Sequence, residues 1–310
     1  MSDNNLLGSL KKQPEKPTPM KNLFLPLYIL ALLLTGLPSV AQNVGITDKP
    51  GGIVPNTQLQ VHKDVSGYSP IIQMTNQSTG ETAADGVILG IDDYDKAFVT
   101  NQVSGGSVYI GTSANNTEIE ADGTLKFNGN ATVWEDLQMP ATAAGAQGGK
   151  VPDWADFRGG IKTWAFANNN ASSEDELYFT VQIPHAWKEG SAIEPHIHVS
   201  PETAPGADQA VVWKLEYVWA NYTSAFPASS TTLTATTTVT GSDDHRHLIT
   251  SFGSITPDAN TNKISSVLVC RLYRNSSDAA DTYTGRIFLV SLDFHFEKDT
   301  EGSRVQYSKN

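Results

Sequence analysis

Residues 285–298 read GRIFLVSLDFHFEK, and the alternation within this stretch decides the fold class. Successive side chains of a β-strand point to opposite faces, so residues two apart share a face. One face collects the apolar side chains of Phe288, Val290, Leu292, Phe294 and Phe296. The opposite face carries Ile287, Leu289, Ser291, Asp293, His295 and Glu297. We therefore expect a strand that buries its Phe288–Phe296 face in a core.

Seven segments upstream of this strand show similar short apolar runs or alternation, bounded by turn-forming residues. The eight expected strands are KTWAFAN (162–168), ELYFTVQIP (176–184), PHIHVS (195–200), AVVWKLEYVWANY (210–222), TLTATTTVT (232–240), HLITSFGSI (247–255), SSVLVCRLYRN (265–275) and GRIFLVSLDFHFEK (285–298). Eight antiparallel strands with connections of variable length predict an all-β jelly-roll-type sandwich over residues 133–310.

The composition agrees with an all-β protein and excludes one class of partner. Only 17% of the 310 residues are charged, and long helical Ala, Glu, Lys and Leu runs are absent, so helix should be scarce. The formal net charge of -12 would repel a phosphate backbone, so we expect no nucleic-acid partner. The single cysteine, Cys270, alternates with Leu268 and Leu272 and is expected to be a buried hydrophobe.

The N-terminus has the features of an export signal. A polar lead over residues 1–19, which a misassigned start would also explain, precedes MKNLFLPLYILALLLTGLPSVAQN. Lys21 supplies the positive flank, and a small-residue pattern ends at Ala41, so we predict a signal peptide over 20–41 with cleavage after Ala41. The apolar run is shorter than a membrane span, so no permanent anchor is expected and the protein should be secreted or at the cell surface.

The mature chain divides near residue 133. All six tryptophans lie after that point, and His62 is the one histidine before it. Between residues 42 and 132 the chain offers short alternating runs with two or three apolar side chains on a face. Strands this thin bury little surface, which favours a β-rich shaft in which several chains share one core over a small monomeric domain.

Two resemblances follow from these segments. The stretches QNVGI, TNQSTGETAADGVILGIDDYDKAFVTNQ and NNTEIEADGTLKFNGN resemble the β repeats of secreted, fibre-like Bacteroidota proteins and phage tail-fibre shafts. The series from WEDLQMP to FHFEKDTEGSR is similar to an uncharacterised jelly-roll-like C-terminal domain of tailed-phage and prophage fibre or virion-associated proteins. The resemblances imply a homotrimer with a structural or adhesive role. Because phage virion proteins seldom carry a secretory signal, the signal favours a bacterial exported protein, and a virion location applies only if the chain is phage-derived.

The stretch GSAIEPHIHVSPE (190–202) raises the alternative of a cupin-like metal enzyme. The candidate ligands of a divalent transition metal are His196, His198, Glu202 and the later strand histidine, His295. The spacing resembles the first half of the cupin signature, but the second half is absent downstream. If apolar faces fill the core, the imidazoles point outward, and neither Pro195 nor Ser200 offers them a second shell. We therefore expect no catalytic residue and no cofactor, and leave open a metal with a structural role.

Two further features offer weaker sites. His185, Trp187 and Lys188 lie in a connection where an exposed Trp could stack on a sugar ring, the third functional alternative. The run Asp243–His247 is expected to be a solvated turn, and Asp293 and Glu297 are too far apart along one strand to form a carboxylate pair unaided. The sequence thus predicts an exported, non-enzymatic, self-associating fibre-like protein whose partners are copies of itself and a surface glycan or protein.

Overall fold

The computed structural model describes residues 44–47, 59–62, 70–92, 94–146, 150–167, 174–257 and 262–309. Contacts divide the chain into two compact units, residues 1–72 with 90–97 and residues 73–89 with 98–310. The predicted lead and signal peptide lie outside the described residues, and the predicted boundary at residue 133 falls within the second unit and stays a prediction. Across the described ranges, no helix is long and apolar enough to span a membrane.

Strands dominate the described chain, and the helical content is two single 3-10 turns, η1 (Gly129–Ala131) and η2 (Ala141–Ala143). The strands before residue 133 are β1 (Val44–Thr47), β2 (Leu59–His62), β3 (Ile71–Met74), β4 (Val87–Ile91), β5 (Ala97–Asn101), β6 (Val108–Gly111), β7 (Asn116–Ile119) and β8 (Leu125–Asn128). They form a parallel β1-β2 pair, a β3-β4-β5 sheet and an antiparallel β6-β7-β8 sheet. The expectation of an all-β chain with little helix is confirmed.

The small sheets β3-β4-β5 and β6-β7-β8 bury almost no apolar surface. Within described residues 70–132, Ile88 is the one apolar side chain that counts as buried. The apolar side chains that remain exposed in this region are Ile71, Ile72, Met74, Leu89, Ile91, Val99, Val103, Tyr109, Ile110 and Ile119, with Tyr94 in a turn. The prediction of strands too thin to fill a core of their own is confirmed.

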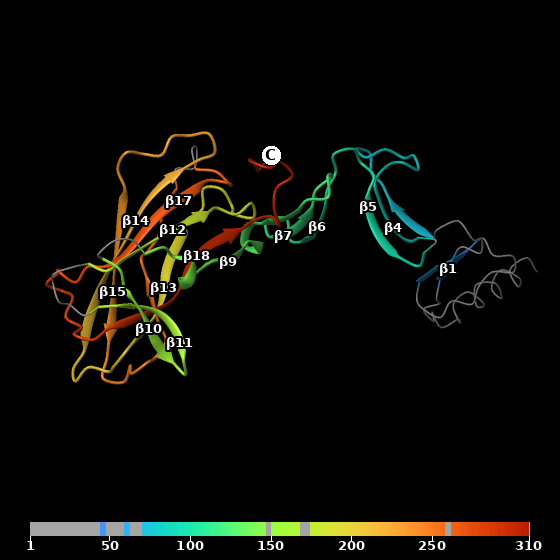
Figure 1. The fold of residues 1–310 in the computed structure, drawn as a ribbon. Helices are drawn as coiled ribbons and strands as arrows, with labels where there is room; N and C mark the ends of the chain where they lie inside the picture. Colours follow the sequence, from blue (N-terminus) through green and yellow to red (C-terminus); the bar gives the residue numbers. More distant parts are fainter. Residues whose placement is uncertain are drawn as a thin grey trace, which may run out of the picture. The chain divides into compact units, whose positions relative to one another are not determined.

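The remaining strands build a two-layer sandwich. They are β9 (Val133–Pro140), β10 (Asp153–Arg158), β11 (Ile161–Phe166), β12 (Glu176–Gln182), β13 (Ile193–Pro201), β14 (Gln209–Ala220), β15 (Thr231–Val239), β16 (Leu248–Ser251), β17 (Val267–Arg274) and β18 (Ile287–Lys298). One sheet has the order β10-β11-β18-β13-β16, with β9 also paired to β18, and the other has the order β12-β17-β14-β15. Figure 1 draws these strands in colours from the green of β9 to the red of β18.

The strand order identifies the sandwich as a jelly roll. Numbered one to eight from β11 to β18, the strands run 1-8-3-6 in one sheet and 2-7-4-5 in the other. This is the order that two interleaved Greek keys produce in an eight-stranded jelly roll. The eight predicted strands are all present, and the antiparallel jelly-roll prediction is confirmed. The structure adds β9 and the β10–β11 hairpin partner β10, which the sequence analysis did not predict.

The core lies between the two sheets. Its fully buried members include Phe166, Ile197 and Phe294 from one layer, Trp213 from the other, and Trp187 from the connection between β12 and β13. Phe166 and Trp213 meet edge to face across the interior, with ring centroids 5.0 Å apart. Cys270 is also buried in this core, as predicted.

A bulge in β18 corrects the predicted core face of that strand. The pairing with β13 matches His198 to Ser291 but Val199 to Leu289, so Val290 is an extra residue without a partner. Alternation reverses there: Leu289 and Leu292 join the core, whereas Val290 is 42% exposed. Phe288, predicted to face the core, packs instead against Phe157 of the β10 strand. The apolar face predicted over Phe288–Phe296 is therefore correct only from Leu292 onward.

Candidate functional site

A row of histidines lies on the face of the β9-β18-β13-β16 layer opposite the core. In β13, Ile197 is a core residue, so His196 and His198 on either side of it point to the other face. Pairing with β18 places His196 directly opposite Asp293 and His198 opposite Ser291. Register between the two central strands of the sheet thus brings two imidazoles and a carboxylate together.

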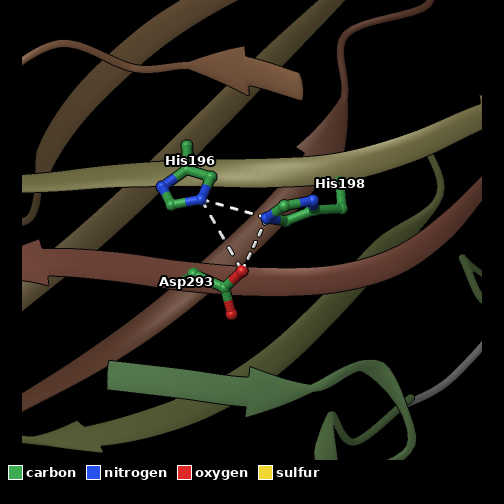
Figure 2. Close-up of side chains that lie close together, drawn as sticks. All are labelled: His196, His198 and Asp293. Atoms are coloured by element: carbon green, nitrogen blue, oxygen red, sulfur yellow. Dashed lines mark hydrogen bonds and ion pairs between the residues drawn. The ribbon is translucent and has the colours of Figure 1, made fainter. Parts of the chain in front are cut away.

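His196, His198 and Asp293 converge on one point, and we call them the triad. Their ligand atoms all lie within 4.8 Å of one another. The His198 Nε2 atom is 2.7 Å from Asp293 Oδ2 and 3.0 Å from His196 Nε2. The distance from His196 Nε2 to Asp293 Oδ2 is 3.6 Å. Figure 2 shows both rings, carried by β13, turned toward the carboxylate on the neighbouring β18.

Neighbouring side chains hold two members of the triad in place, which corrects the prediction that no such supporting contacts exist. The Nδ1 atom of His198 lies 2.6 Å from Nε2 of His247, and the two rings stack. The hydroxyl of Ser291 donates to Asp293 Oδ1 at 3.0 Å. These contacts fix the orientation of one imidazole and of the carboxylate, as the outer contacts of metal ligands generally do.

His295, a predicted ligand, lies beside the triad and not in it. Its ring is 4.3 Å, centroid to centroid, from the ring of His196. Its Nε2 atom contacts Asp136 of β9 at 2.7 Å, and the ring of Trp134 lies 6.5 Å away. His295 therefore extends the row toward β9, so that four of the seven histidines in the chain lie in one line, His295, His196, His198 and His247.

The triad is buried although it lies outside the core. The side chains of His196, His198 and Asp293 are 7%, 18% and 4% exposed. Burial, and after it the charge of the neighbouring His295, lowers the pKa of His196, which favours the neutral ring. A neutral imidazole is the form of histidine that ligates metals.

Glu202, the remaining predicted ligand, is not part of this cluster. Its carboxylate forms a two-point ion pair with the guanidinium of Arg286, with Oε2 accepting from Nε at 3.0 Å. Hydrogen bonding to Arg286 lowers the pKa of Glu202. The structure therefore does not bring Glu202 to the histidine pair, and the carboxylate that lies beside His196 and His198 is Asp293 of β18.

The predicted sugar-contact residues make internal contacts. Trp187 is fully buried and packs near Trp219, so its ring has no face for a sugar, which corrects the stacking prediction. The His185 ring lies between two serine hydroxyls, Ser303 at 2.6 Å and Ser265 at 2.8 Å. Lys188 pairs with Glu297 at 2.6 Å. All three side chains hold the β12–β13 connection onto the sandwich.

Two members of the site were missed in the sequence analysis. Asp293 was considered only as a partner of Glu297 on its own strand, whereas its partners come from β13. His247 was assigned to a solvated turn, yet it stacks on His198. The available signal was an outward His-x-His in one strand and an outward Asp-x-His in another, but the register that joins them is not readable from alternation alone.

A hollow of about 430 Å³ lies on the same layer, next to the bulge in β18. It opens where β9 and β11 pair with different parts of β18, and Val290 and Ser291 line it. None of the triad residues is among its lining residues, so the hollow does not expose the ligand atoms.

No protein-family model and no curated protein matches the chain. Among solved structures, the chain is similar to the CBM22-1 and GH10 modules of Clostridium thermocellum xylanase 10B complexed with xylohexaose (11% identity, TM-score 0.29, covering 52% of this chain and 28% of that one). It is also similar to tailspike protein 4 of bacteriophage CBA120 (8%, 0.25, 52% and 19%) and to infectious bursal disease virus Gt strain (9%, 0.29, 74% and 50%). The chain thus spans half or less of each of these chains, and we base the jelly-roll assignment on strand order alone.

Proposed function

We propose that this chain is an exported, non-enzymatic, fibre-like protein that self-associates through its N-terminal β-sheets and presents the jelly-roll domain for surface or assembly contacts. The observation that carries the proposal is the exposed apolar surface of β3 to β8, where Ile88 alone is buried among the apolar side chains of described residues 70–132. The implied partner for that surface is a second and third copy of the same chain.

The energetics favour association over a solitary chain. A three-stranded sheet needs an apolar face covered by another layer to be stable. Burying one Ile or Leu side chain contributes about 1.5–3 kcal/mol. Ile110, Ile91 and Leu89 are 77%, 47% and 45% exposed in this chain. Bringing copies together would bury these side chains at once, and three copies is the number implied by the resemblance to trimeric shafts.

A cupin-like enzyme is the competing proposal, and two observations weigh against it. Cupin-like chemistry needs a substrate space at the metal ligands, whereas the hollow on this layer is not lined by the triad. Ile197, between the two histidines, is a core residue, so both rings lie on the outer face of the sheet and not inside the barrel. Both observations agree with a jelly roll that makes binding contacts and catalyses no reaction.

The test is the mass of the chain from Gln42 onward in sedimentation equilibrium, for the natural sequence and two variants. Ile110→Ser removes an apolar side chain from β6 and should weaken association by roughly tenfold or more, because each copy loses about 1.5–3 kcal/mol of burial. Ile249→Ser is the matched control, since Ile249 is 61% exposed on β16 of the sandwich. Association that both variants leave unchanged would refute a role for the N-terminal sheets.

A further inference from the structure

We propose that His196, His198 and Asp293 bind one divalent transition-metal ion of the zinc class, which links the two central strands β13 and β18 on the outer face of the jelly roll. The inference is independent of self-association, because all three ligands come from one chain and from directly paired strands.

The fold places the ligands before any ion binds. His196 and Asp293 are opposite each other in the β13–β18 ladder, and His198 is two pairs further along, opposite Ser291. Asp293 lies between the core residues Leu292 and Phe294 and so points to the outer face, and the bulge at Val290 lets Leu289 face the core as well. The backbone hydrogen bonds of a central strand pair therefore hold the donor atoms in place.

The spacing of the donor atoms suits a small ion. Metal–ligand bonds of about 2.0–2.2 Å put the donors of a tetrahedral zinc site about 3.3–3.6 Å apart. The three distances within the triad are 2.7, 3.0 and 3.6 Å, so little movement would complete such a site. Three protein ligands leave the fourth position of the shell open.

Hydrogen bonds alone cannot account for all three close contacts within the triad. The Nε2 atom of His198 lies within hydrogen-bond distance of both Asp293 Oδ2 and His196 Nε2, and it carries at most one hydrogen. The 3.6 Å from His196 Nε2 to Asp293 is too long for a hydrogen bond. A cation at the centre would accept all three lone pairs, and His198 Nδ1 would then donate to His247.

The charge of Asp293 also favours a bound cation at the triad. A buried carboxylate needs a cationic partner, and the buried Asp281 has one in Arg274 at 2.7 Å. In the part of the chain that the structure describes, no Lys or Arg pairs with Asp293, whose contacts are His196, His198 and the Ser291 hydroxyl. A divalent ion would supply the missing charge to a ligand set of two imidazoles and one carboxylate, which suits zinc, cobalt or nickel better than calcium or magnesium.

The direct test is titration of the purified, tag-free and chelator-stripped protein with Zn²⁺ in a calorimeter. We expect one ion per chain, and no binding of Mg²⁺ or Ca²⁺ under the same conditions. Titration with Co²⁺ should give the visible absorption of a cobalt ion held in a low-symmetry, near-tetrahedral shell. Absence of Zn²⁺ heat together with absence of a cobalt spectrum would overturn the proposal.

Substitutions test which side chains bind the ion. His198→Gln should reduce Zn²⁺ affinity by more than the roughly 10- to 100-fold that loss of an outer contact costs, and Ser291→Ala should reduce it within that range. His245→Gln is the matched control, because His245 pairs with Asp244 outside the triad, and it should bind as the natural protein does. Unchanged binding by His198→Gln would refute the assignment. Because Asp293 is buried, the Asp293→Asn variant also needs a circular dichroism spectrum to show that it folds. If it does not fold, the His198→Gln variant still tests the site, because His198 is partly exposed.

Discussion

At the scale of single residues, the surroundings of a buried polar side chain determine what it can do, and the sandwich contains two contrasting cases. Asp293 is buried on the outer face among histidines, where a charge can be neutralised. Cys270 is buried in the apolar core, and burial raises the pKa of its thiol to about 12. A thiol that stays protonated in the folded chain is a packing element and not a nucleophile, which agrees with the sequence prediction.

The raised pKa of Cys270 makes a testable contribution to stability at high pH. The thiol of the unfolded chain ionises near its ordinary pKa of 9.0, whereas burial in the folded chain raises that pKa to about 12. The unfolded state therefore binds fewer protons in that window, so stability falls as pH rises from 9 towards 12, by up to about 1.4 kcal/mol per pH unit. Urea unfolding between pH 7 and pH 10.5 should show this slope relative to Cys270→Ala. Parallel pH profiles for the two proteins would be evidence against the buried thiol.

At the scale of secondary-structure elements, the bulge in β18 lets the strand bury apolar side chains in the core on both sides of Val290. Before Val290, the residues of β18 that face the core are Ile287 and Leu289. After Val290, they are Leu292, Phe294 and Phe296. Asp293, between Leu292 and Phe294, points to the outer face and lies opposite His196. The extra residue thus allows Leu289 and Leu292 to share the core while the carboxylate meets the histidines.

The bulge predicts opposite outcomes for two neighbouring substitutions. Val290→Asp should cost less than about 1 kcal/mol, because an exposed strand position tolerates a polar residue. Leu292→Asp should prevent folding, since Leu292 is 2% exposed in the core and would bury an unpaired charge. Chemical unfolding followed by circular dichroism measures both. Equal destabilisation by the two substitutions would instead favour uninterrupted alternation through Val290.

The same element shows how much the sequence alone could predict. Alternation was sufficient to locate all eight jelly-roll strands, because each has a face that must be buried. It placed His196 and His198 on one face for the same reason. Alternation could not locate the bulge, because Phe288 and Val290 are as apolar as core residues. The contact between Asp293 and the histidines was also not predicted. It depends on the register between β13 and β18, which lie far apart in the chain.

At the scale of the whole molecule, the chain combines a self-sufficient jelly roll with sheets that bury almost nothing. The sandwich has a continuous core drawn from both of its layers. The sheets of β3 to β8 leave Ile72, Leu89, Val99 and Ile110 exposed. Under the proposed function, copies of the same chain would cover these exposed side chains.

The most direct test of self-association is the light-scattering mass of the chain from Gln42 to Asn310, measured in solution over a hundredfold range of dilution. We expect the mass of three chains, retained as the protein is diluted, because the exposed apolar residues of β3 to β8 would be buried between copies. A mass of one chain at every concentration, in a protein whose circular dichroism shows folded β-structure, would contradict it.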